Sequence, residues 1–122
     1  MIAYATLGTN DLEKAVAFYD ALFSDLGVSK MSPNERITLW TDASGKGMVG
    51  VIKPFNEEPA TPGNGNMLAI GVDSLETIEK LHAKALKLGA TDEGEPGPRM
   101  PGMNFAYVRD PEGHKLAFFS QG

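Results

Sequence analysis

The chain has 122 residues, enough for one small domain and little more. Its composition, 42% hydrophobic and 22% charged, is that of a globular protein and excludes disorder of the whole chain. Eleven Lys and Arg against 16 Asp and Glu give a net charge of −5, which disfavours nucleic acid and anionic membranes as partners. The absence of cysteine excludes disulfides, thiolate nucleophiles and thiolate zinc sites. With no signal-like or membrane-spanning stretch, we expect a cytoplasmic protein.

The first half of the chain has the pattern of a strand, a helix and a hairpin. Residues 2–7 form a short apolar strand, and Asn10 followed by Glu13 has the spacing of a helix N-terminal cap. Apolar residues then recur at helical spacing until Gly27: Leu12, Ala15, Val16, Tyr19, Leu22, Phe23 and Leu26. Two strand-like runs, 37–41 and 48–52, flank turn residues 42–47, and residues 28–31 are a weaker candidate for a strand.

The second half repeats this order after a segment rich in proline and glycine, residues 54–66. Residues 67–72 predict a strand, and Asp73 with Glu76 predicts the start of a helix that runs to Gly89. A Pro/Gly-rich loop at 94–102 then leads to strands at 104–108 and 115–119. We expect a single domain, 1–122, built from two copies of one unit: module one at about 1–54, a linker at 55–66 and module two at about 67–122.

Two segments carry a family resemblance, Asp11 to Tyr19 (DLEKAVAFY) and Asp110 to Leu116 (DPEGHKL). On the basis of these two segments, the chain is identified as a member of the vicinal oxygen chelate superfamily, which includes glyoxalase I, bleomycin-resistance proteins and extradiol dioxygenases. Residues 63–67 and 91–99 resemble a glyoxalase-like branch of unassigned function. The resemblance implies an α+β fold in which two tandem βαβββ modules form a U-shaped, eight-stranded mixed sheet around a cavity. It also implies a homodimer.

Enzymes of this superfamily bind a divalent metal through His and Glu or Gln at four equivalent strand positions. Carried over to this chain, those positions fall near Tyr4, Val49, Met67 and Ala117, none of which is a good ligand. A divalent metal is the one cofactor that the resemblance implies, and its ligand set is missing. His114 with Asp110 or Glu112 is an alternative metal site without a recognised spacing. We otherwise expect His82 and His114 to be packing or surface residues.

The lining of the implied cavity follows from the two-residue period of strands. Residues expected on the face of the four ligand-equivalent positions are Tyr4 with Thr6, Val49 with Val51, Met67 with Ala69, and Ala117 with Phe119. Trp40, Met48, Phe105 and Tyr107 are near neighbours on the hairpins, and for each of them the cavity and the packing core remain equal alternatives. Arg99 is suited to capture a carboxylate or phosphate at the cavity mouth. The alternative is a solvated arginine, or one paired with Glu93 or Glu95.

Three functions remain open at this point. The first is a glyoxalase-like lyase or isomerase, similar to lactoylglutathione lyase, acting on a small oxygenated metabolite. The second is a metal-free, non-catalytic protein that sequesters a drug or metabolite, as bleomycin-resistance proteins do. The third is a dimer whose pocket is filled by Met67, Phe119 and Tyr4. The negative net charge and the aromatic residues favour a cationic planar ligand, whereas Arg99 favours an anion.

Overall fold

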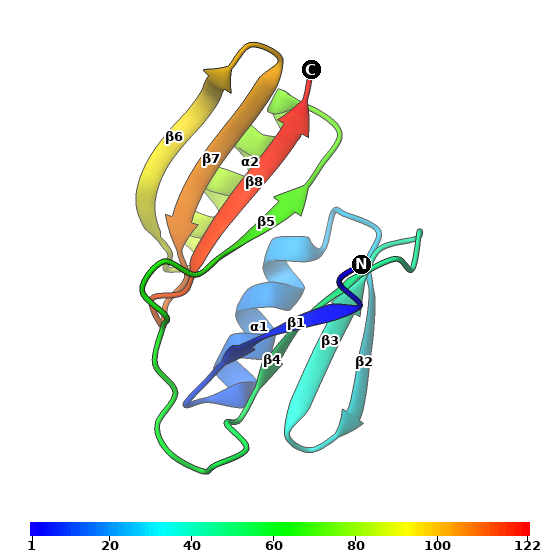
Figure 1. The fold of residues 1–122 in the computed structure, drawn as a ribbon, viewed down its shortest axis with the longest axis vertical. Coiled ribbons are helices and arrows are strands. Elements are labelled where there is room, and N and C mark those ends of the chain that lie inside the picture. The colour runs from blue at the N-terminus through cyan, green and yellow to red at the C-terminus, as the bar shows by residue number, and fades with distance from the viewer. The chain divides into compact units, whose positions relative to one another are not determined.

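The computed structural model describes all 122 residues and divides the chain into two compact units, Met1–Thr61 and Pro62–Gly122. Each unit has the element order βαβββ, and each contains its own four-stranded mixed sheet (Figure 1). The predicted α+β class and the tandem βαβββ modules are therefore confirmed. The arrangement of both sheets around one cavity stays a prediction. Neither helix has the length and apolar character that crossing a membrane requires.

The first unit contains β1 (Tyr4–Gly8), α1 (Leu12–Phe23), β2 (Ser29–Asn34), β3 (Ile37–Thr41) and β4 (Met48–Ile52). Its strand order is β1-β4-β3-β2, with β1 parallel to β4 and the other pairs antiparallel. The predicted helix and β3–β4 hairpin are confirmed. The helix ends at Phe23, before the expected stop at Gly27.

The predicted cap of the first helix is wrong by one residue. Asp11, not Asn10, is the N-cap, and its side chain accepts from the Lys14 amide. Asn10 instead makes a reciprocal pair with Ala60, which lies 50 residues further along the chain. The Asn10 side-chain amide donates to the Ala60 carbonyl at 3.1 Å, and the Ala60 amide donates to Asn10 Oδ1 at 2.8 Å. Asn10 thus ties the start of α1 to the middle of the long segment that connects β4 with the second unit.

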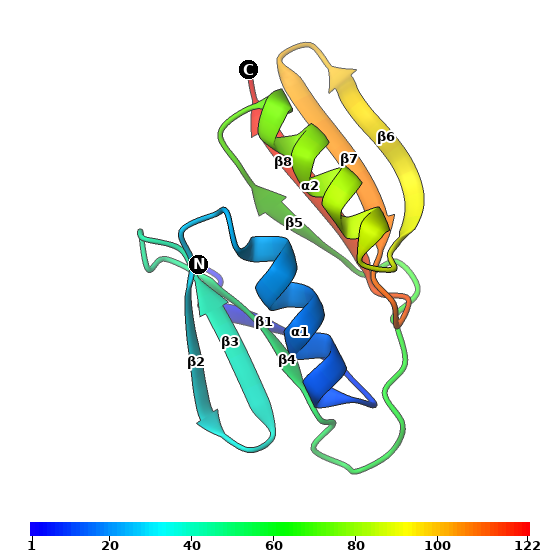
Figure 2. The same cartoon turned by 180° about the vertical axis from the view of Figure 1, so that it is seen from behind.

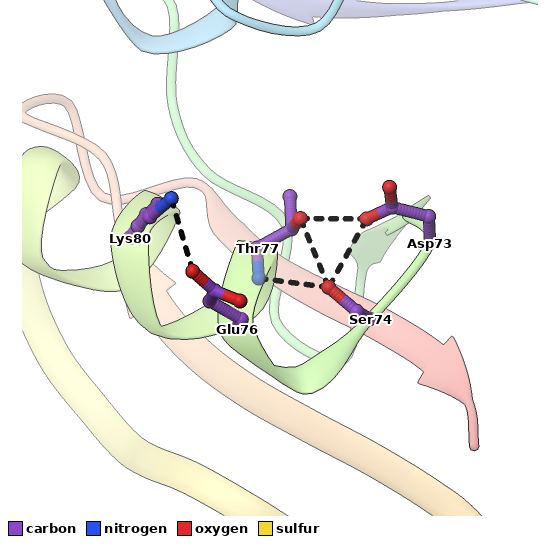
Figure 3. A network of polar contacts seen from close by, with 5 residues as sticks. All are labelled: Asp73, Ser74, Glu76, Thr77 and Lys80. Carbon is purple, nitrogen blue, oxygen red and sulfur yellow. Dashed lines mark hydrogen bonds and ion pairs between the residues drawn. The ribbon is translucent and has the colours of Figure 1, made fainter.

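The second unit contains β5 (Met67–Gly71), α2 (Leu75–Lys87), β6 (Thr91–Met100), β7 (Met103–Arg109) and β8 (Lys115–Gln121). Its strand order is β5-β8-β7-β6, which matches the first unit position for position. Here too the expected cap is shifted, because Ser74, not Asp73, accepts from the Thr77 amide. Asp73 accepts from the Ser74 and Thr77 hydroxyls and so holds the capping residues in place (Figure 3).

The predicted loop at 94–102 is largely a strand. Strand β6 runs from Thr91 to Met100 and includes Pro96 and Pro98. It lies at the edge of the sheet, where one side of the strand needs no amide donors, so prolines are tolerated. Its pairing with β7 shifts register three times, at Asp92/Gly94, Gly94/Gly97 and Pro98/Met100. Because of its prolines and bulges, this strand has the sequence pattern of a loop.

The core of the first unit forms where α1 packs on one face of its sheet. The buried helix residues are Phe18, Tyr19, Leu22 and Phe23. The centroid of the Trp40 ring on β3 lies 5.8 Å from that of the Tyr19 ring and 6.1 Å from that of the Phe23 ring. Its Nε1 donates to Asp20 Oδ1 at 2.9 Å, and Asp20 Oδ2 accepts from Lys30 Nζ at 2.8 Å. Asp20 therefore links α1 to both β2 and β3.

In the second unit α2 covers one face of the sheet, seen in front of the strands in Figure 2. The buried residues of α2 are Ile78, Leu81, His82 and Ala85. Alternate residues of β7 and β8 are buried with them: Ala106, Val108, Leu116, Phe118 and Ser120. The Ser120 hydroxyl has no hydrogen-bond partner although the residue is only 1% exposed. The opposite face of this sheet is turned to the viewer in Figure 1.

Replacing Asp20 with Asn should reduce stability in a pH-dependent way. Burial opposes ionisation of Asp20, but the Lys30 and Trp40 hydrogen bonds outweigh it and hold its pKa below the usual value. A carboxyl group whose pKa is lower in the folded than in the unfolded protein stabilises the fold. This contribution is fully present at pH values above the unfolded-state pKa of about 4, and it is lost as the pH falls through the folded-state pKa. Because Asp20 and Lys30 are both partly exposed, we expect Asp20→Asn to lower the free energy of unfolding by less than about 1 kcal/mol at pH 7. The effect should shrink at pH 3.

Urea titrations followed by fluorescence of Trp40, the one tryptophan, measure this difference. Glu58→Gln, which neutralises an exposed carboxylate of the same unit, is the matched control. A loss of stability of equal size at pH 7 and pH 3 would contradict the conclusion that the ionised Asp20 carboxylate stabilises the fold.

Replacing Ser120 with Ala should leave stability unchanged or raise it by up to about 1 kcal/mol, because a buried hydroxyl without a partner costs desolvation energy. The matched control is Thr38→Val, which removes a buried hydroxyl that is paired with Ser32 at 2.9 Å. We expect this control to lose about 1 kcal/mol. Thermal unfolding of both variants checks the contrast, and a Ser120→Ala protein as unstable as Thr38→Val refutes it.

Candidate functional site

The four positions equivalent to the family's metal ligands carry no suitable donor set. Tyr4 lies on the edge strand β1 and is 56% exposed, and Met67 on the edge strand β5 is 42% exposed. Val49 pairs with Ala5, and Ala117 is fully buried. A phenol, a thioether and two hydrocarbon side chains do not replace the imidazole and carboxylate ligands that divalent metals prefer. The residues present therefore do not fit a divalent metal at these positions.

The two histidines serve other contacts. His82 on α2 is buried, and its Nε2 lies 3.0 Å from Asp92 Oδ1 at the start of β6. The Gly94 amide and the His82 ring together hold the pKa of Asp92 below its usual value. His114 is also buried, and its amide and that of Glu112 donate to Asp110 Oδ1. Asp110 thus organises the β7–β8 turn, and the chain contains no group of three His, Asp or Glu side chains able to hold a metal ion.

The register of the first sheet places Val49, an expected lining residue, on the same face as Trp40, for which cavity and core are equal alternatives. Met48 pairs with Tyr4, and Val49 pairs with both Ala5 and Trp40. Trp40 is 3% exposed and packs against the rings of α1, so Val49 and Trp40 both lie on the helix face of the sheet. Met48, not Val49, shares the opposite face with Tyr4. Which residue of β4 shares a face with Tyr4 is decided by the pairing of β1 with β4, and the local sequence does not reveal that pairing.

The second sheet brings the remaining predicted residues together. Register pairs Phe105 with Phe119, Tyr107 with Ala117, and Ala69 with Ala117, so all lie on the face opposite α2. The Phe105 and Tyr107 rings are parallel, with their centroids 5.6 Å apart. The centroid of the Phe119 ring is 4.9 Å from that of Phe105. We call this surface the aromatic face; its residues are Met67, Ala69, Phe105, Tyr107, Ala117 and Phe119. The three rings are half-buried, which leaves part of each accessible.

Two cations lie over the aromatic face. The Arg99 guanidinium is 5.5 Å from the centroid of the Tyr107 ring, and Lys115 Nζ is 5.2 Å from it. Arg99 Nη1 donates to the Gly97 carbonyl and Nη2 to the Glu95 carbonyl. The predicted alternative, a carboxylate partner for Arg99, is not found, because Glu93 pairs with Arg109 and Glu95 contributes only its backbone. Neither Arg99 nor Lys115 takes part in an ion pair.

Lys115 was not among the predicted site residues. The sequence does contain a signal for it, since Lys115, Ala117 and Phe119 are spaced by two along one strand and so share a face. The contact with Tyr107 also depends on β7 pairing antiparallel with β8.

Gly94 makes room for Arg99 over the Tyr107 ring. A Cβ at position 94 would lie 2.8 Å from Tyr107 Cδ2 and 3.2 Å from Arg99 Nη2. Any side chain there would therefore displace the guanidinium or the ring. The bulged course of β6, with its register shift at Gly94/Gly97, lets the arginine fold back along its own strand.

Comparisons with known proteins agree with this architecture. The family model "Glyoxalase/Bleomycin resistance protein/Dioxygenase superfamily" matches residues 1–118. A glyoxalase/bleomycin resistance protein from Albidiferax ferrireducens T118 is 34% identical, with a TM-score of 0.89 over 100% of this chain and 99% of that one. A search of curated proteins finds no match.

Two further structures share the fold at lower identity. One is a glyoxalase/bleomycin resistance protein/dioxygenase family enzyme from Burkholderia phytofirmans PsJN, 22% identical, with a TM-score of 0.79 over 98% of each chain. The other is a glyoxalase-related enzyme from Fulvimarina pelagi, 23% identical, with a TM-score of 0.77 over 99% of this chain and 88% of that one. By the match over residues 1–118 and the 34% identical full-length relative, the chain belongs to the glyoxalase/bleomycin resistance protein/dioxygenase superfamily.

Proposed function

We propose that this protein binds a small planar molecule on the aromatic face of its second unit, without a metal ion and without catalysis. The observation that carries the proposal is the set of three half-buried rings, Phe105, Tyr107 and Phe119, on the sheet face opposite α2. Rings stack on planar ligands and supply much of the affinity in small-molecule sites. A cytoplasmic homodimer stays a prediction.

The donor chemistry favours sequestration over a lyase or isomerase. Metal-assisted chemistry needs an ion held by protein ligands so that it polarises a carbonyl of the substrate. Tyr4, Val49, Met67 and Ala117 do not supply such ligands, whereas the aromatic face needs none. The proposal that Met67 and Phe119 fill the site has less support, because Met67 is 42% exposed and Phe119 is half-buried.

Removing the rings should weaken binding whether or not a metal is supplied. The probe is naphthamide, a neutral planar molecule, and its dissociation constant is measured by ligand-observed NMR after dialysis against EDTA. We expect Phe105→Leu and Phe119→Leu each to weaken binding by about threefold to tenfold, because leucine keeps the apolar bulk but loses the stacking. Phe55→Leu is the matched control, since Phe55 is 84% exposed and lies in the first unit.

The same titration is repeated with Ni²⁺, Zn²⁺, Mn²⁺, Fe²⁺ and Co²⁺. The proposal predicts equal affinity with and without these ions. Binding that requires one of them, or that Phe55→Leu weakens as much as Phe119→Leu does, would contradict it.

A further inference from the structure

We infer that the ligand of the aromatic face carries a carboxylate, which Arg99 and Lys115 bind beside the Tyr107 ring. The inference rests on the proposed function and adds to it the chemical class of the ligand, a planar acid. Three features of the second unit support it: the local charge, the fixed position of the guanidinium and the neighbouring rings.

The local charge is opposite to that of the whole chain. The protein has a net charge of −5, yet two cations, Arg99 and Lys115, lie over the Tyr107 ring. Because both lie within 5.5 Å of one ring centroid, they are no more than about 11 Å apart, close to one Debye length at 0.1 M salt. Glu93, one of the carboxylates considered as a partner for Arg99, is paired with Arg109 at 2.9 Å instead. A bound anion would relieve the repulsion between the two cations.

The Arg99 guanidinium is fixed before any ligand arrives. Its two terminal nitrogens donate to the carbonyls of Gly97 at 3.0 Å and Glu95 at 2.7 Å. These contacts use two of its five N–H donors and leave its positive charge without a carboxylate. A side chain already held in place loses less entropy when it binds, so the remaining donors form a prepared site for an anion.

The rings select the rest of the ligand. Phe105 lies parallel to Tyr107, within 8°, and its ring centroid is 4.9 Å from that of Phe119, so the three rings form one apolar surface beside the two cations. A planar acid places its carboxylate against Arg99 and Lys115 and its ring system over Phe105 and Phe119. A planar cation, which the net charge of the whole chain favours, would face two like charges here.

Two matched probes test this assignment on the full-length protein: naphthoate and its neutral counterpart, naphthamide. At pH 7 and low salt we expect naphthoate to bind about tenfold more tightly, as one or two charge-assisted hydrogen bonds would give. Arg99→Ala and Lys115→Ala should each remove most of this preference, measured as the ratio of the affinities for the two probes. The preference should also fall as salt is raised.

Arg36→Ala is the matched control, because Arg36 also lies over an aromatic ring, that of Phe55 at 5.2 Å, but in the first unit. It should leave the affinities for both probes unchanged. Gly94→Ala tests the position of the guanidinium without removing its charge, since the added methyl group collides with Tyr107 and Arg99. We expect this variant to reduce the preference for naphthoate as well. Circular dichroism confirms that each variant is folded.

The outcomes separate the inference from the function on which it rests. Equal affinity for naphthoate and naphthamide, both weakened by Phe119→Leu, overturns the carboxylate assignment and keeps the proposed function. Tighter binding of a naphthylmethyl ammonium ion than of naphthoate likewise overturns the assignment. If none of the probes binds, both proposals fail.

Discussion

In each unit a single helix packs on one face of a four-stranded sheet, and this packing determines which strand side chains remain available for binding. Strand residues alternate between faces, so burying Ala106, Val108, Leu116 and Phe118 under α2 places Phe105, Tyr107, Ala117 and Phe119 on the other face. A one-residue shift of register would exchange the two sets and expose the core. The aromatic face is therefore held in place by the same interactions that stabilise the second unit.

The edge strand β6 adds charge to this surface. Because its pairing with β7 is interrupted by bulges and Gly94 has no side chain, Arg99 folds back over Tyr107 and bonds to carbonyls of its own strand. Lys115 reaches the same ring from β8. The familiar chemistry of the superfamily depends on metal ligands that are missing here, whereas this pair of cations offers a way to bind an anionic ligand without a metal.

Much of the fold could be predicted from the sequence, because amphipathic periodicity and capping residues are local signals. The helices, the β3–β4 hairpin and the tandem modules follow from them, and the Asp11–Tyr19 and Asp110–Leu116 motifs indicate the family. Strand β6 was not predictable in this way, since its prolines and glycines are typical of a loop. The faces of Trp40 and Val49 depend on the pairing of β3 and β1 with β4, which is a long-range property. The orientation of Arg99 depends in turn on the bulges of β6.

The most direct test of the central claim is a methyl NMR titration of the EDTA-treated protein, labelled at alanine and methionine methyl groups, with naphthoate. Met67 and Ala69 lie on the aromatic face, whereas Ala85 on α2 and Ala106 on β7 lie in the core between helix and sheet. Metal-free binding to the aromatic face predicts saturable shifts of the Met67 and Ala69 signals, with the Ala85 and Ala106 signals nearly unchanged. Shifts confined to the first unit, or shifts that appear only after a divalent metal is added, would contradict it.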